Sequence, residues 1–344
     1  MRFPSFWRRP IEPRSPEVWL HIGLPKCGSP SIQHYLAETD EVNRARGVFY
    51  PSAYRSVDGY RSHLPLAMAS RRDDLQTAIR EIREETSGSR SIVLSCEELS
   101  DALPGGGAPR LVHALNDTFG SGHVRIVCYF RNIFQFVESS YAQFLTGGLF
   151  YIDKAEFFSS GRSSIGDFMN CFERDKGFPI FSPAGFVECV TSAFPDNRVL
   201  FRSIEKEDLL GRSLTEDLCQ LLGIPHTATS ARPRNKRQPN RRVAALQYAQ
   251  CVSDPQAFAR VSRKMRGFRF APSDIGQRPF RNSTINLDKD AADQIREALE
   301  ADSEKLRAVF STGVNGLLED RWRPIGDEAD LTEGEKEEIC RFLR

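Results

Sequence analysis

Four short apolar runs, each followed by a segment with helical features, constrain the fold of this 344-residue chain more than any other feature. The runs are Val18–Ile22, Ser91–Ser95, Val124–Phe130 and Arg198–Arg202. Strands that alternate with helices predict βαβ units, and hence an α/β fold with a central, mainly parallel sheet flanked by helices on both faces. Such sheets bind ligands at the carboxyl ends of their strands. We therefore expect the residues after Ile22, Leu94 and Phe130 to share one crevice.

Helices are expected from about Ser29, over Phe134–Leu145 and over Leu214–Leu222, with further helices between Leu287 and Leu318. The basic, proline-rich segment 1–16 is expected to be a flexible arm, 17–325 a single domain and 326–344 a C-terminal helix. Within the domain, segment 150–183 is rich in Phe, Ser and Gly without a sustained period, and 230–285 opens with a basic, proline-punctuated loop. We interpret both as insertions that cover the substrate and a nucleotide.

Composition narrows the class of partner. The formal net charge is +1 and the mean hydropathy is −0.42, so no global field favours a nucleic acid or a membrane surface. No apolar run has the length that spans a bilayer. The eight cysteines form no C-x-x-C pair, which argues against zinc and a disulfide framework and favours reduced thiols in a cytoplasmic protein.

The segment Gly23–Ser31 follows the first expected strand and opens a helix. Glycines allow a tight turn that exposes successive N–H groups, and a helix start adds unpaired donors and a positive dipole end. Lys26 adds a charge, and Ser29 and Ser31 add hydroxyls, so the segment predicts an anion cradle. The alternative is an ordinary strand–turn–helix with Ser29 as N-cap and Pro30 at the first helical position. Because the lysine precedes the second glycine, the pattern G-x-x-x-x-G-K-[ST] of kinases and NTPases is not met.

A second candidate anion site lies at the end of the third expected strand. Arg131 stands where a guanidinium can bind a phosphate with two hydrogen bonds. Ser139, about two helical turns further on, can present a hydroxyl to the same crevice. The alternative is a capping arginine and a small helix-packing serine.

These two sites together resemble the PAPS-dependent sulfotransferases, which use 3′-phosphoadenosine 5′-phosphosulfate as donor. Leu24–Ser29 is similar to their P-K-[ST]-G-[ST]-[ST] loop, and Arg131 with Ser139 is similar to their Arg-Asn/Asp-Pro motif and its serine eight residues on. Ser95–Leu99 resembles the S-S-E-x-L segment of the bacterial and glycan-type branch. The chain departs from the pattern at three positions, which are Cys27, Pro30 and Ile133.

The resemblance implies a P-loop-like α/β fold and an in-line, metal-independent transfer of a sulfuryl group from PAPS to a hydroxyl, with PAP as the second product. It implies an acceptor such as a carbohydrate or a glycolipid. The residues that it assigns to the donor are Pro25, Lys26, Cys27, Gly28, Ser29, Pro30, Ser31, Arg131 and Ser139, and we add Arg234 and Lys236 of the basic loop. Lys26 would also neutralise charge on the leaving oxygen.

Two residues are candidates for the general base that takes the acceptor proton. Glu97 is the first, because glycan-type relatives use a glutamate, and His63 is the second, because other branches use a histidine. A carboxylate at a helix start and a core histidine are the structural alternatives.

Two other functions remain open at this point. Pro30 removes an N–H and a hydroxyl from the cradle, so a degenerate module that binds nucleotide without transfer is one alternative, and a P-loop-type kinase is a weaker one. No nucleic-acid-binding motif accompanies the basic clusters, so a nucleic-acid partner is not expected.

Overall fold

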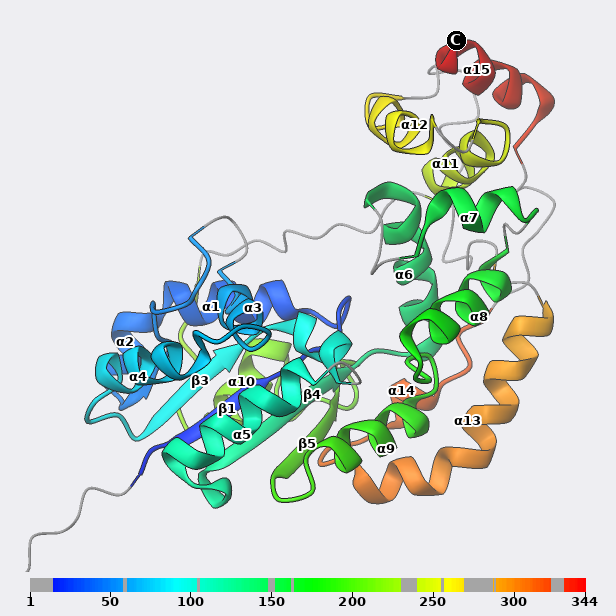
Figure 1. Cartoon of the computed structure of the whole chain (residues 1–344). Coiled ribbons are helices and arrows are strands. Elements are labelled where there is room, and N and C mark those ends of the chain that lie inside the picture. Colours follow the sequence, from blue (N-terminus) through cyan, green and yellow to red (C-terminus); the bar gives the residue numbers. More distant parts are fainter. Residues whose placement is uncertain are drawn as a thin grey trace, which may run out of the picture.

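Five parallel strands form one sheet at the centre of the computed structural model (Figure 1), which describes residues 15–57, 61–103, 106–147, 152–161, 164–229, 240–254, 257–268, 287, 289–322 and 331–344. The strand order is β2-β3-β1-β4-β5, and every neighbouring pair is parallel. The strands are β1 (Glu17–His21), β2 (Val48–Phe49), β3 (Ser91–Ser95), β4 (Val124–Phe130) and β5 (Arg198–Ser203). The predicted α/β fold with a parallel sheet is confirmed.

The apolar runs became strands because the sheet is covered on both faces. Every residue of β3 is buried, and only Arg125 of β4 is partly exposed, so these strands are continuous hydrophobic runs without polar alternation. The first strand ends at His21, one residue before the expected Ile22, and β5 extends one residue past Arg202. The edge strand β2 has two residues, too short to show a period, and it was not predicted.

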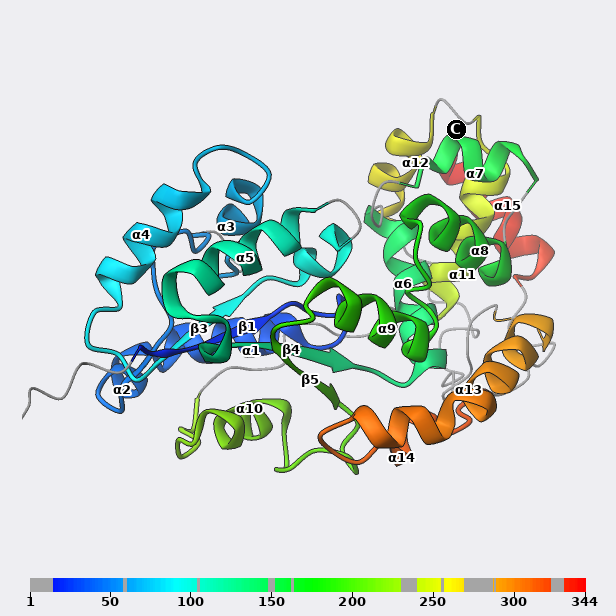
Figure 2. The same ribbon diagram turned by 60° about the horizontal axis from the view of Figure 1, so that its bottom comes forward.

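Helices cover both faces of the sheet (Figure 2). On one face lie α3 (Leu64–Ala69), α4 (Leu75–Glu85) and α5 (Gly107–Phe119); α1 (Ser29–Glu38) and α10 (Leu214–Leu222) lie on the other. The remaining elements near the sheet are α2 (Asp40–Arg44), the 3-10 helices η1 (Glu97–Ala102) and η2 (Ser121–His123), and α9 (Pro183–Ala193). The α10 bounds match the prediction, and Gly223 ends that helix in the left-handed conformation.

A helical lobe extends beyond the sheet (Figure 1). It is built around α6 (Ile133–Gly147), with α7 (Lys154–Ser159), α8 (Ile165–Lys176), α11 (Asn240–Cys251), α12 (Phe258–Met265) and α15 (Glu333–Leu343). Aromatic side chains form its core, including Tyr141, Phe144, Phe157, Phe158, Phe168 and Phe258. Segment 150–183, interpreted as an aperiodic excursion, is therefore largely helical where the structure describes it, and its described phenylalanines are core residues.

The expected C-terminal helices are α13 (Lys289–Val309) and α14 (Asn315–Leu318). Most of the 1–16 arm, residues 326–330 of the C-terminal segment, and Arg234 and Lys236 fall outside the described residues. Among the described helices, none combines the length and the apolarity required to cross a membrane.

One buried ion pair ties β5 to α10. The Arg202 and Asp217 side chains are 1% and 0% exposed, and Arg202 Nε donates to Asp217 Oδ2 at 2.6 Å. The Asp217 carboxylate also accepts the Tyr129 hydroxyl at 2.7 Å and the Leu210 amide at 2.9 Å, and Arg202 donates to Ser311 Oγ at 3.1 Å. Because both charges have several partners, the pair tolerates burial.

Candidate functional site

The loop between β1 and α1 is fixed by the neighbouring strand. The Ile22 and Leu24 amides donate to the Val127 and Tyr129 carbonyls at 3.1 and 3.0 Å, and the Tyr129 amide donates back to the Gly23 carbonyl at 2.7 Å. The loop therefore continues the pairing of β1 with β4 before it turns into the helix.

The turn itself requires left-handed backbone conformations. Lys26 has φ 64° and Gly28 has φ 86°, and Gly28 is the N-cap of α1. A Cβ on Gly28 would lie 2.4 Å from Leu214 Cδ2, so both the conformation and the close approach of α10 require glycine. Within the described part of the chain, the amides of Lys26, Gly28 and Ser29 donate no hydrogen bond. Three N–H groups at a helix start are thus available to an anion.

The other predicted loop residues play different parts. Ser29 is buried and its hydroxyl donates to the Leu24 carbonyl at 3.4 Å, so it stabilises the loop from inside. Ser31 is exposed, and its amide donates to the Gly28 carbonyl at 2.9 Å. Pro30 is the second helical residue rather than the first, because Gly28, not Ser29, is the N-cap. Pro25 is buried beneath the turn.

Cys27 lies beneath the loop and contacts the second motif. Its side chain is fully buried, and burial raises the pKa of the Cys27 thiol to about 12 despite the nearby Arg131 charge and backbone amide. A thiol with this pKa stays protonated at neutral pH, so Cys27 packs the loop against the end of β4 and is not a nucleophile.

The two predicted anion motifs meet at the carboxyl edge of the sheet. Burial and then the Arg131 charge lower the pKa of Lys26, whereas Cys27 and Glu97 act in the opposite direction. A Cβ on Gly23 would lie 3.3 Å from Cα and Cβ of Glu97, which packs η1 against the loop. The crevice expected after the strands at Ile22, Leu94 and Phe130 thus brings together Lys26, Glu97 and Arg131.

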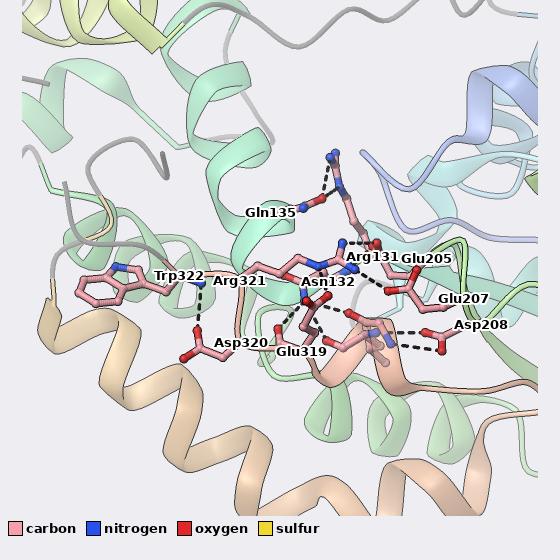
Figure 3. Close-up of polar contacts among 12 residues, drawn as sticks. Arg131, Asn132, Gln135, Glu205, Glu207, Asp208, Glu319, Asp320, Arg321 and Trp322 are labelled. Carbon is pink, nitrogen blue, oxygen red and sulfur yellow. Dashed lines mark hydrogen bonds and ion pairs between the residues drawn. The ribbon is translucent and has the colours of Figure 1, made fainter. Parts of the chain in front are cut away.

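Arg131 follows the last residue of β4, and its side chain extends toward Gln135 of α6 (Figure 3). Its Nε and one terminal nitrogen donate to Gln135 Oε1 at 3.2 and 3.1 Å, and within the described residues it forms no ion pair. Lys26 likewise forms no ion pair in that part of the chain. Lys26 and Arg131 are thus two cations that form no ion pair there, and they lie near amides that donate no hydrogen bond. Such an arrangement can bind an anion.

Ser139 does not present its hydroxyl freely. The hydroxyl lies 2.8 Å from the Gln135 carbonyl and 3.0 Å from the Phe136 carbonyl, so its one proton is used inside α6. A phosphate accepts hydrogen bonds only, so binding to Ser139 requires this side chain to rotate out of its helical bond.

Asn132 anchors the Arg131 motif to the rest of the fold (Figure 3). Its amide donates to Glu205 Oε1 at 2.8 Å, and its side-chain nitrogen donates to the Gly316 and Glu319 carbonyls at 3.0 and 2.8 Å. Arg321 binds three carboxylates around this residue, those of Glu205, Glu207 and Glu319. Asp208 accepts the Gly316 and Leu317 amides at 3.2 and 3.1 Å, which fixes α14 against the same corner. Sequence reasoning missed these roles, because no local pattern links positions about 190 residues apart.

Glu97 stands at the start of η1 as a half-buried carboxylate. Burial raises the pKa of Glu97 to about 7, the charge of Glu98 adds to this, and a hydrogen bond from Gln33 opposes it. Gln33 Nε2 donates to Glu97 Oε2 at 2.6 Å. A carboxyl that titrates near neutral pH suits a general base. Gln33 was missed, although its position one helical turn after Ser29 was a usable signal.

His63 is held in the layer behind Glu97. Its Nε2 lies 3.2 Å from the Pro51 carbonyl, which can only accept, and its Nδ1 receives the Ser95 amide at 3.2 Å. Both ring nitrogens are therefore in use in the neutral form, and burial lowers the pKa of His63 to about 3. His63 is a buried residue that joins the segment after β2 to the last residue of β3, and we do not propose it as the base.

No cluster of three or more metal-ligating side chains occurs in the described ranges. No family model matches the chain, and no curated protein matches it. Among solved structures, a sulfotransferase from Alicyclobacillus acidocaldarius is similar, with 15% identity and a TM-score of 0.36 over 71% of this chain and 98% of that one. We rest neither the fold nor the function on a likeness of this degree.

Proposed function

We propose that this chain transfers a sulfuryl group from PAPS to a hydroxyl of an acceptor such as a carbohydrate or a glycolipid. The observation that carries the proposal concerns the described part of the chain. There, two cations that form no ion pair, Lys26 and Arg131, meet three amides that donate no hydrogen bond and the half-buried carboxylate of Glu97. This arrangement suits a ligand with two separate anionic groups and a reaction that needs a base.

The residues present fit such a donor. The Lys26, Gly28 and Ser29 amides would hold the 5′-phosphosulfate, and Arg131 would hold the 3′-phosphate that distinguishes PAPS from ADP and ATP. Gln135 accepts from Nε and one terminal nitrogen of Arg131, and the other N–H groups of the guanidinium would bind the phosphate. The Ser29 hydroxyl stays in its bond with Leu24 and is not part of our donor set.

The reaction forms a sulfur–oxygen bond to the acceptor and breaks the sulfur–oxygen bond to the donor phosphate. In our proposal Glu97 receives the proton of the acceptor hydroxyl, and Lys26 neutralises the charge that develops on the leaving phosphate oxygen. The two residues lie far apart in the sequence, yet the charge of Glu97 raises the pKa of Lys26.

A degenerate binding module is the second candidate, and a specific observation favours it. Pro30 lacks an N–H, and Ser29, the residue before it, turns its hydroxyl inward, so neither residue offers the anion a hydroxyl and Pro30 offers no amide. Such a module would bind PAP and transfer nothing.

One experiment separates these candidates. The melting temperature of the protein is measured with PAP, ADP and 5′-AMP, and transfer of labelled sulfate from PAPS is measured with a panel of mono- and oligosaccharides. We expect PAP to stabilise by about 2.7 kcal/mol at 100 times its Kd and the other two nucleotides to act much more weakly. Stabilisation without transfer to any acceptor favours the degenerate module. Equal stabilisation by PAP and ADP contradicts the proposed role of Arg131.

A further inference from the structure

Gln33 is a buried amide in the candidate site that no motif explains. It lies on α1 with its side chain fully buried, although glutamine is seldom found in a core. Its Nε2 donates to two oxygens, Glu97 Oε2 at 2.6 Å and Ser95 Oγ at 3.3 Å. The side chain thus links α1 to both the last residue of β3 and the first residue of η1.

The Ser95 end of this link is itself fixed. Ser95 Oγ lies 2.8 Å from His21 Nδ1, and the Ser95 amide donates to His63 Nδ1 at 3.2 Å. Both histidines are buried and pack against tyrosine rings, His21 on Tyr129 and His63 on Tyr50. The Ser95 contact of Gln33 is therefore fixed by buried residues. The other contact of Gln33 binds the Glu97 carboxylate.

We propose that Gln33 is the positioning residue of the Glu97 carboxylate, holding Oε2 so that the other oxygen receives the acceptor proton. This inference rests on the proposed function. The hydrogen bond orients the carboxylate. An ionised carboxylate oxygen can only accept, and Gln33 presents a donor to it, so the bond favours the charged form of Glu97.

The chemistry of an amide explains why a neutral residue stands here. An arginine or lysine at this place would add a full positive charge and drive the pKa of the carboxyl far below neutral, which would weaken it as a base. An apolar residue would leave a buried carboxylate oxygen without a partner and favour the protonated acid. An amide lies between these extremes, since it supports the ionised form without neutralising it.

Other charged and titratable groups also face Glu97. Glu98 and Asp101 lie on η1 itself, Lys26 comes from the loop after β1, and Tyr50 and Cys96 lie on the adjoining segments. Asp101 is 3.3 Å from Lys176 of α8, which offsets part of its charge. None of these groups changes when Gln33 is replaced, so a change in Glu97 titration reports on Gln33.

The test is a pH titration of the Glu97 carboxyl by carbon-13 NMR, in which Glu97→Gln identifies the resonance and transfer is not needed. In Gln33→Leu we expect the midpoint to rise by about one pH unit, a tenfold change in the protonation equilibrium. In a plot of transfer rate against pH, the rise on the acid side should shift by the same amount. The KM for PAPS should stay within about twofold of the wild-type value.

A matched control separates positioning from packing. Gln250 is also fully buried and donates to a serine hydroxyl, Ser262 Oγ at 2.7 Å, but it lies on α11 in the helical lobe. Gln250→Leu should reduce stability in a similar way and leave the Glu97 midpoint unchanged. If Gln33→Leu does not fold, Gln33→Glu keeps the size and polarity; its two carboxyls should share a proton and raise the upper midpoint above that of the wild type.

The outcomes are distinguishable from those of the proposed function. An unchanged midpoint in Gln33→Leu, in a protein that binds PAP and transfers sulfate, overturns the role of Gln33 alone. Absence of both PAP binding and transfer in the unmodified protein overturns the proposed function, and with it the base that Gln33 would position.

Discussion

Arg131 and Arg202 lie on or next to neighbouring strands, and their surroundings are opposite. Arg202 is 1% exposed and bonded to Asp217 and Ser311, whereas the half-buried side chain of Arg131 bonds, among the described residues, to the neutral Gln135 alone. A charge in the fold's interior must be paired, because removing it from water costs several kcal/mol. A cation without an anion at the edge of a parallel sheet is available to a ligand, so Arg202 serves the fold and Arg131 serves the site.

The largest expected effect concerns the paired arginine. Arg202→Met leaves the Asp217 carboxylate buried without its cation, so we expect a loss of about 3–5 kcal/mol in the free energy of unfolding, measured by urea denaturation. Arg202→Met combined with Asp217→Leu should recover part of that loss. A loss below about 1 kcal/mol in the single variant would remove the distinction between the two arginines.

Glu97→Gln should lower the transfer rate and should change the stability of the fold only in a pH-dependent way. Loss of a general base lowers the transfer rate by about 10²–10⁴-fold. The folded pKa of Glu97, about 7, is above its ordinary value of 4.5, so the ionised form opposes folding, and stability that is present at low pH is lost as pH rises through 7. The variant should therefore equal or exceed the wild type in stability at pH 8 and lose that advantage at pH 5. Full transfer activity in this variant would exclude Glu97 as the base.

Arg131→Ala should weaken PAP binding by about 30- to 100-fold, because a charge-assisted contact to phosphate is lost, and should change stability by less than about 1 kcal/mol. Isothermal titration calorimetry measures the affinity. Arg125→Ala is the matched control, since Arg125 lies at the other end of β4 and pairs with Glu17. Equal losses of PAP affinity in both variants would mean that charge alone, and not position, accounts for binding.

A further effect concerns how stability depends on pH at the buried residue His63. His63 has a folded pKa of about 3 against an ordinary 6.5, so the unfolded chain binds the proton first and stability falls as pH drops from about 6.5 toward 3. His63→Gln can keep both hydrogen bonds and should reduce that fall by about 1.4 kcal/mol per pH unit between pH 6 and 4. If the slope of stability against pH is the same in His63→Gln as in the wild type, the pKa of His63 does not differ between the folded and the unfolded protein.

The prediction of the sheet succeeded where a local pattern carried the information. Strands β3 and β4 have their predicted bounds because a buried parallel strand is an uninterrupted apolar run. The loop was predicted because its glycines and the helix start mark a tight turn, and in the structure Gly28 has a positive φ and α10 lies close to it. Helices α7 and α8 were missed because their phenylalanines face several neighbouring helices and so hide the period.

The chain alone determined a parallel α/β fold and placed Lys26, Glu97 and Arg131 after three strand ends, because strand propensity and turn chemistry are encoded over a few residues. Tertiary structure decided which charges are paired. In the folded chain Arg202 pairs with Asp217, and Arg131 donates to the side-chain amide of Gln135. Both ring nitrogens of His63 are hydrogen-bonded, and Gln33 donates to Glu97. Those outcomes depend on contacts between residues 4 to 64 positions apart, which a sequence specifies only through the packing of the whole core.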